Sequence, residues 1–313
     1  MLLFVLRRLA AGLVLLFVLS SATFFLLNLT GQDPAREVAG QAAGVAQVTA
    51  KRHELGLDQP VLTRYGDWLS HAVRGDLGTS WFTSNPVTTV LGQALPITLS
   101  LVFGAMLLTA VLSVGLGVWA AVRGGWLDRA LQVLSTVTFA VPNFLIALVL
   151  ALLFAVKLGL FPATGYTTFT ESPTGWIASI TLPAVALALG AIATVATQVR
   201  GSMIEVLRQD YVRTLRARGL PRRSILYRHA LRNAAPPGLT TLSIMFIATI
   251  SGAVIVEKVF NLPGIGTQAN QSAAQGDLPL VLGIVVVTVV LVVLVNLLLD
   301  LAQGWLNPKV RVS

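Results

Sequence analysis

Arginine is the side chain in this 313-residue sequence with the clearest capacity for charged contacts with another molecule. Nine arginines lie within residues 200–233, where the only acidic residues are Glu205 and Asp210. Long apolar runs flank this segment, and a segment with so many charges cannot itself enter the hydrocarbon of a bilayer. The sequence therefore predicts a basic segment on the cytoplasmic side of a membrane, able to form ion pairs with an acidic surface.

The other reactive residue types do not predict an enzyme. The chain has no cysteine, which excludes disulfides, thiolate metal sites and a catalytic thiol. No lysine follows a glycine, as a phosphate-binding loop would require. His53 and His71 lack a third soft ligand, and His229 has no acidic cluster around it. We therefore expect no catalytic residue, metal site or cofactor in this chain.

The basic segment has the periodicity of helices. Gly219 can turn the chain through a positive φ, and Pro221 can be the first residue of a following helix. Pro236 and Pro237 are expected to end that second helix. The apolar residues before the turn recur at spacings of three and four, which predicts one helix with a face to bury: Met203, Val206, Leu207, Tyr211 and Leu215.

Composition and hydropathy predict an all-α integral membrane protein. Hydrophobic residues make up 55% of the chain and charged residues only 11%, against about a quarter charged in soluble proteins. Both termini are predicted to be cytoplasmic, because this places 15 of the 22 basic residues inside. Six apolar runs are long enough to cross a bilayer as helices: residues 9–29, 96–122, 131–156, 178–199, 238–256 and 280–301.

Three parts of the chain follow from this topology. Residues 1–29 form the N-terminus and first transmembrane helix, with a cleaved signal peptide as the alternative interpretation. Residues 30–95 form an extracytoplasmic domain, because they are too many for a plain connector. Residues 96–313 form a five-helix core that contains the basic loop 200–236. The aromatic residues of the outer domain can be its core, an interfacial belt or a docking surface: Tyr65, Trp68, Trp81 and Phe82.

Small residues in the predicted spans indicate close helix packing. Ser113, Gly115 and Gly117 would let another helix approach the second span. Residues 184–193 are rich in alanine and glycine, so the fourth span should be thin and should either pack tightly or line a cavity.

Polar residues and a proline mark candidate sites for a pathway through the spans. Pro142 is expected to kink the third span, because it frees a backbone carbonyl. Asn143 either satisfies that carbonyl or lines a polar path. Gly252 and Asn296 are further candidates for a pathway or for helix packing.

Residues 210–220 resemble the cytoplasmic "EAA" loop of ABC importer permeases, in the form found in the dipeptide, oligopeptide and nickel branch. The sequence DYVRTLRARGL keeps the glycine-centred turn but has Arg213, Leu215 and Arg218 where that family often has Glu, Ala and Lys. Residues 55–80 and 256–266 resemble other segments of the same branch. The resemblance implies a type I importer fold with six transmembrane helices, in which a coupling helix lies between the fourth and fifth.

In that family the coupling helix binds an ATPase subunit. The resemblance therefore implies one or two cytoplasmic ABC ATPase subunits, which would hold ATP and Mg, and an extracytoplasmic substrate-binding protein. It also implies a second, homologous permease subunit in the lipid of a bacterial or archaeal plasma membrane, although a homodimer stays open. The residues expected to couple to the ATPase are Leu207, Asp210, Tyr211, Arg213, Thr214, Leu215, Arg216, Ala217, Gly219 and Leu220.

The implied function is import of di- or oligopeptides, with nickel or another small solute as the alternative within the branch. An ion-driven carrier is the alternative from another class, but such carriers usually have charged residues in mid-membrane. Here Glu257 and Asp300 lie near the ends of spans, and Glu257 is expected to reach the outer interface. A channel is not supported, because the sequence has no recognisable filter. A DNA-binding role for the basic segment is not supported by its predicted position between two membrane spans.

Overall fold

The computed structural model of the chain describes residues 2–40 and 42–306. Within these ranges the chain is helical, apart from turns and an isolated bridge between Thr79 and Pro86. Lys309 and Arg311, which contribute to the predicted cytoplasmic charge count, lie outside the described residues. The chain divides into two compact units, Met1–Ile97 with Pro263–Leu294 and Thr98–Leu262 with Val295–Ser313.

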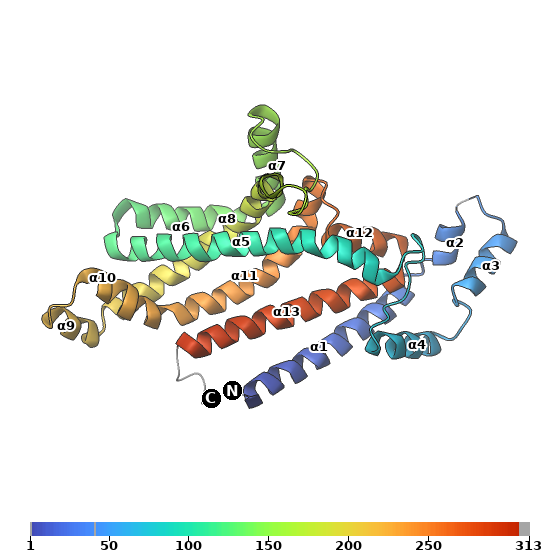
Figure 1. The fold of residues 1–313 in the computed structure, drawn as a ribbon, viewed down its shortest axis with the longest axis horizontal. Coiled ribbons are helices and arrows are strands. Elements are labelled where there is room, and N and C mark those ends of the chain that lie inside the picture. Colours follow the sequence, from blue (N-terminus) through green and yellow to red (C-terminus); the bar gives the residue numbers. More distant parts are fainter. Residues whose placement is uncertain (1, 41, 307–313) are drawn as a thin grey trace. The chain divides into compact units, whose positions relative to one another are not determined.

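The first unit contains the predicted outer domain. Tyr65, Trp68 and Trp81 are partly buried and pack against a buried cluster of Phe24, Leu278 and Leu282, which favours the core alternative for these three aromatics. Its helices, shown in Figure 1, are α1 (Leu2–Leu29), α2 (Pro34–Ala39), α3 (Val45–Glu54), α4 (Val61–Val73), the start of α5 (Val87–Arg123), α12 (Ile265–Gln275) and much of α13 (Leu278–Leu306).

A buried carboxylate fixes the loop before α5 within this unit. Asp277 is 1% exposed, and its Oδ2 accepts a hydrogen bond of 2.5 Å from Ser80 Oγ. Its Oδ1 accepts from the backbone N–H groups of Trp81 and Leu280. One side chain therefore satisfies loop donors and a donor in the first turn of α13.

The second unit is organised around α8 (Pro173–Leu207), which contacts α6, α7 and α11. Figure 1 shows α9 and α10 at the same end of this unit as the turn from α5 to α6. The other helical segments of this unit are α6 (Gly125–Ala140), α7 (Asn143–Leu150), α9 (Asp210–Ala217), α10 (Arg222–Ser224), α11 (Leu231–Val259) and the π-helical segments η1 (Ala151–Lys157) and η2 (Ile225–Ala230).

Small side chains allow α5 and α8 to run parallel at close range. A Cβ atom placed on Gly117 would lie 2.7 Å from the carbonyl oxygen of Ala196 and 2.8 Å from Val199 Cβ. The predicted close approach is therefore confirmed at Gly117, whereas a Cβ on Gly115 would meet no atom within 4 Å. The predicted thinness of α8 is also confirmed, because most of its alanines are buried against neighbouring helices.

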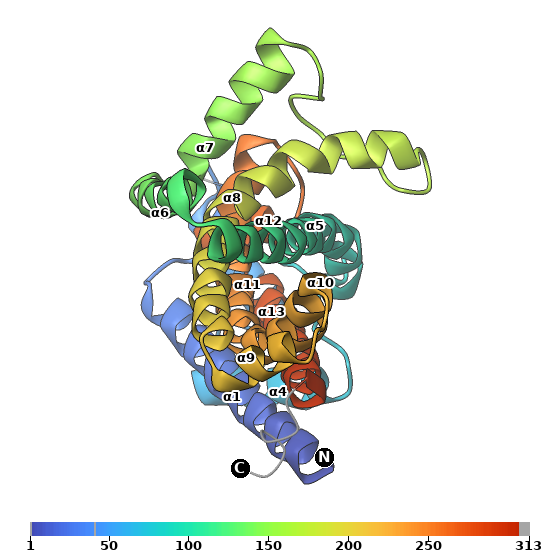
Figure 2. The same cartoon turned by 90° about the vertical axis from the view of Figure 1, so that its left-hand side faces the viewer.

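Within residues 2–40 and 42–306, five helices are long and apolar enough to cross a membrane, or six if one bent pair counts as a single span. The bent pair joins Asp128–Thr138 to Asn143–Lys157 at an angle of 104°. The interruption predicted at Pro142 is confirmed, but it is much sharper than a kink. Figure 2 shows α7 leaving α6 in a new direction. The described residues thus form a multi-pass, all-helical architecture.

Several prolines lie inside helices. Pro96 lies inside α5, which begins at Val87, and Pro183 lies inside α8. The prediction that Pro236 and Pro237 end a helix is wrong, because helix continues through both from Arg222 to Val259. An interior proline removes one backbone hydrogen bond, and a long helix packed against neighbours tolerates that loss.

Glu257 does not reach the outer interface as expected. It is fully buried, and its Oε1 accepts a hydrogen bond of 2.6 Å from Thr98 Oγ1. The bond joins the last turns of α11 to α5. The same end of the unit holds a bond from Trp176 Nε1 to Ser100 Oγ, so the start of α8 lies beside α5.

Replacement of Gly117 by valine should destabilise the second unit by about 1–3 kcal/mol, because the added side chain would overpack the α5–α8 contact. The check is the thermal unfolding midpoint of the purified protein in detergent. Gly115→Val is the matched control on the same helix, since it meets open space. Equal midpoints for the two variants would contradict this packing.

Candidate functional site

The predicted coupling helix is shorter than the apolar pattern suggested. The expectation of one helix through residues 203–215 is wrong, because α8 ends at Leu207 and α9 begins at Asp210. The N–H groups of Arg208 and Gln209 each bond to a carbonyl three residues back, which tightens the chain into a turn. The apolar stripe is therefore divided between two helices.

Two contacts attach α9 to the following helical run. Val212 is fully buried, and α9 contacts η2. Asn233 Nδ2, on α11, donates a hydrogen bond of 2.9 Å to the hydroxyl oxygen of Tyr211. Sequence reasoning missed Val212, although its spacing of three from Leu215 was a usable signal. The helix is thus fixed to Arg222–Val259 at neighbouring positions.

Gly219 makes the predicted turn. Its φ is +76°, and no atom would lie within 4 Å of an added Cβ, so backbone conformation rather than space requires glycine here. Gly219 N donates to Arg216 O and Leu220 N to Leu215 O, which is the pattern of a Schellman motif. The sequence predicts Pro221 as the first residue of the next helix. It lies immediately before α10, which begins one residue later, at Arg222.

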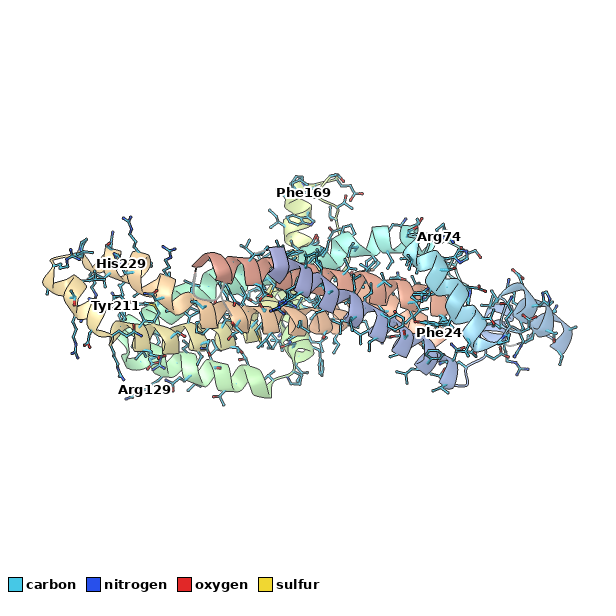
Figure 3. The ribbon with its side chains drawn as sticks, turned by 90° about the horizontal axis from the view of Figure 1, so that it is seen from below. Phe24, Arg74, Arg129, Phe169, Tyr211 and His229 are labelled. Carbon is cyan, nitrogen blue, oxygen red and sulfur yellow. The ribbon has the colours of Figure 1, made fainter. Side chains whose placement is uncertain are left out.

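The exposed face of α9 carries charge. Asp210 and Arg213 form an ion pair of 3.3 Å, with side chains that are 92% and 77% exposed. Such a pair adds little to folding stability, because water screens it. Thr214, Ala217 and Arg218 are also exposed. Figure 3 shows Tyr211 at the same end of the second unit as His229 and Arg129.

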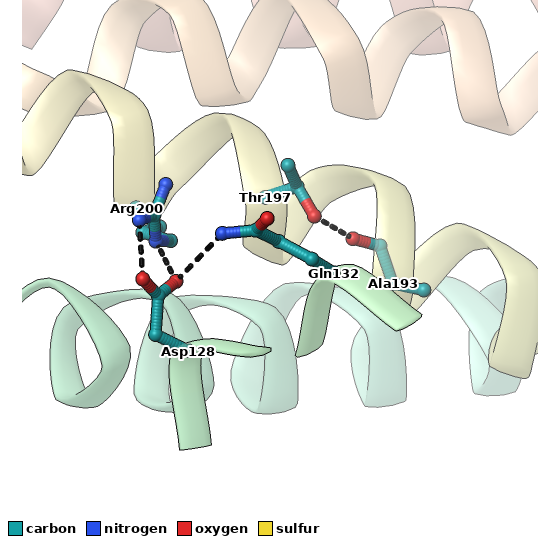
Figure 4. A network of polar contacts seen from close by, with 5 residues as sticks. All are labelled: Asp128, Gln132, Ala193, Thr197 and Arg200. Carbon is teal, nitrogen blue, oxygen red and sulfur yellow. Dashed lines mark hydrogen bonds and ion pairs between the residues drawn. The ribbon is translucent and has the colours of Figure 1, made fainter. Parts of the chain in front are cut away.

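A second ion pair anchors α6 to α8 at this end. Arg200 Nη2 donates to Asp128 Oδ2 at 2.5 Å, and Arg200 Nε also pairs with this carboxylate (Figure 4). Gln132 Nε2 donates to Asp128 Oδ1 at 3.2 Å. Both charged side chains are mostly buried, so loss of one partner would leave a poorly solvated charge. The predicted topology places Asp128 and Arg200 on the cytoplasmic side of the membrane, but the sequence alone does not predict an ion pair between them.

A cavity of about 320 Å³ lies at the break between α6 and α7. Asn143 lines it, and the Cβ position of Gly252 lies 3.5 Å from Asn143 Nδ2. Among the described residues no hydrogen bond uses the Asn143 side chain, so it does not satisfy the carbonyl that Pro142 frees, and its role in a pathway stays a prediction. Asn296 is not part of this lining. The other polar side chains that line the cavity are Thr138, Thr194 and Thr249.

The threonines of this lining are already satisfied within their own helices. Thr138 donates to Leu134 O, Thr194 to Gly190 O and Thr249 to Met245 O. The amide of Asn143 therefore provides the available side-chain donor in this lining, while the threonine hydroxyl oxygens can still accept. Across residues 2–40 and 42–306, no group of three His, Cys, Asp or Glu side chains could hold a metal ion.

Comparison with known proteins covers nearly the whole chain. Residues 113–312 match the family described as binding-protein-dependent transport system inner membrane component, and residues 1–102 match its N-terminal family. A permease protein of a peptide transport system in Brucella abortus is 38% identical over 308 residues, or 98% of each chain. A peptide ABC transporter permease protein of Sinorhizobium fredii is 39% identical over 309 residues, 98% of this chain and 99% of that one.

The oligopeptide transport system permease protein OppB of Mycobacterium tuberculosis is 39% identical over 321 residues, covering 98% of each chain. These matches confirm the resemblance carried by residues 210–220. The chain belongs to the binding-protein-dependent transport system inner membrane component family of ABC transporter permeases.

Proposed function

We propose that this chain is the transmembrane permease subunit of an ATP-driven importer for di- or oligopeptides, which an extracytoplasmic binding protein delivers. The observation that carries the proposal is similarity over 98% of the chain to permeases named for peptide and oligopeptide transport. The importer works in the plasma membrane of a bacterium or archaeon, with both termini of the chain cytoplasmic and the bent pair at Pro142 counted as one of six spans.

The energy comes from partner subunits. One or two ABC ATPase subunits hold ATP and Mg, and a second, homologous permease completes the pathway. The exposed face of α9 is the docking surface for the ATPase, because Asp210, Arg213 and Arg218 offer charges that fix the orientation of a partner. Thr214 and Ala217 lie on the same exposed surface.

Motion of the ATPase reaches the spans through α11. A displacement of α9 would carry the helical run Arg222–Val259 with it, because α9 contacts η2 and the Tyr211–Asn233 bond joins α9 to α11. Met245, Ala248 and Thr249 of α11 line the cavity that holds Asn143. The coupling surface and the candidate pathway are therefore linked by one continuous helix.

Reconstituted complex should accumulate a labelled tripeptide in proteoliposomes only when its binding protein and ATP are both supplied, the ATP on the side of the ATPase. The measurement is uptake with ATP, without ATP and with an imposed ion gradient alone. Uptake driven by the gradient alone would contradict the proposal. If Ni²⁺ inhibits uptake of the labelled tripeptide and unlabelled peptides do not, nickel would replace peptides as the proposed substrate.

Gly219→Val should uncouple ATP hydrolysis from peptide uptake, because a β-branched residue at a φ of +76° is strained by about 1–2 kcal/mol. The ratio of ATP hydrolysed to peptide taken up should rise, while the protein remains in the membrane. Gly219→Asn is the matched control, since asparagine tolerates this conformation better. Wild-type coupling in the valine variant would place the coupling surface elsewhere, first at the turn between α5 and α6.

Tyr211→Phe should also raise the ratio of ATP hydrolysed to peptide taken up, without releasing the ATPase. The variant loses one hydrogen bond to Asn233, with a contribution of about 0.5–1.5 kcal/mol to the attachment of α9. Tyr227→Phe is the matched control, because Tyr227 is 62% exposed. If Tyr211→Phe and Tyr227→Phe have the same ratio of ATP hydrolysed to peptide taken up, the Tyr211–Asn233 bond does not contribute to coupling.

A further inference from the structure

A second cavity of the second unit lies between α9 and the membrane-spanning helices α5 and α8. Its volume is about 510 Å³. Arg216 of α9 and Arg222 of α10 line it, together with Leu207 and Leu220. The remaining lining is apolar and comes from α5 and η2: Ala121, Val122, Ile225 and Leu226.

The charge of this cavity is unbalanced. No acidic residue lines it, and within the part of the chain that the structure describes neither Arg216 nor Arg222 forms an ion pair. Of the other arginines in residues 200–233, all of them described by the structure, Arg200 pairs with Asp128 and Arg213 with Asp210, and the rest form no ion pair. Two guanidinium groups beside an apolar wall fit a ligand that is anionic at one end and apolar at the other.

Exposed aromatic side chains place the cavity at the level of lipid headgroups. Trp119 and Trp126 are 45% and 77% exposed, and they bracket the two α5 residues of the lining. Tyr227, 62% exposed, directly follows Leu226. Tryptophan and tyrosine concentrate where the hydrocarbon meets water, and basic pockets at that depth bind anionic headgroups.

We propose that this cavity binds an anionic phospholipid, with Arg216 and Arg222 contacting the headgroup phosphate and the acyl chains lying along the apolar wall. The bound lipid would bridge α9 to α10 and support the coupling helix from its membrane side. Arg216 therefore serves a different role from Arg213, because Arg216 lines the cavity and Arg213 does not. The inference goes beyond the proposed function and does not depend on which solute is transported.

The test is native mass spectrometry of the purified chain titrated with dioleoyl phosphatidylglycerol or with dioleoyl phosphatidylcholine. Each basic side chain near an anionic headgroup contributes about a fivefold gain in affinity. Arg216→Gln and Arg222→Gln should each weaken phosphatidylglycerol binding about fivefold, and the double variant about thirtyfold. Arg223→Gln is the matched control, because Arg223 neighbours Arg222 but does not line the cavity. It should bind like the parent, and phosphatidylcholine should bind weakly throughout.

Three results would overturn the proposal. The first is equal affinity of the parent and both single variants for phosphatidylglycerol. This comparison does not need the double variant, so it still decides the matter if the double variant fails to fold. The second is displacement of phosphatidylglycerol by excess inorganic phosphate, which would indicate a site for a free anion. The third is release of the ATPase subunit by the variants with lipid binding unchanged, which would assign the arginines to that protein interface.

Discussion

The close packing of small side chains around α8 is the constraint on which the second unit depends. Helices in lipid gain little from burial of apolar surface against each other, so close backbone contact has to supply much of their association. Gly117 brings α5 onto α8, and the alanines of α8 are buried against its neighbours. Near the break at Pro142, Gly190 and Ala191 leave a cavity instead. Small residues therefore have two effects in this unit: some allow the helices to pack closely, and others leave a cavity between them.

A few polar contacts then fix how the packed helices are joined. Asp128 and Arg200 join α6 to α8, and Thr98 and Glu257 join α5 to α11. The hydroxyl of Tyr211 ties α9 to α11. A largely buried ion pair is costly to break by removing one partner, whereas an exposed neutral bond is weaker. The attachment of α9 is therefore the weakest of the three.

Features set by a single residue or by local periodicity could be predicted from the sequence. The glycine turn at Gly219, the close approach at Gly117 and the interruption at Pro142 all follow from backbone chemistry. Predictions failed where tertiary packing overrides local preference, as when α11 continues through Pro236 and Pro237. Of the candidate pathway residues, Asn143 lines the cavity and lies beside Gly252, but neither Gly252 nor Asn296 is part of the lining. The Asp128–Arg200 pair joins residues that are distant in sequence, so only the fold could reveal it.

The claim that α9 and the start of the following helical run move as one body can be tested by a distance measurement. Because the chain has no cysteine, spin labels can be attached at Thr214→Cys on α9 and Arg228→Cys on η2 without background. Pulsed electron resonance on the reconstituted complex should give the same distance distribution without nucleotide and with ATP bound. A distribution that shifts on ATP binding would show that α9 moves independently of α11 and would contradict this account of coupling.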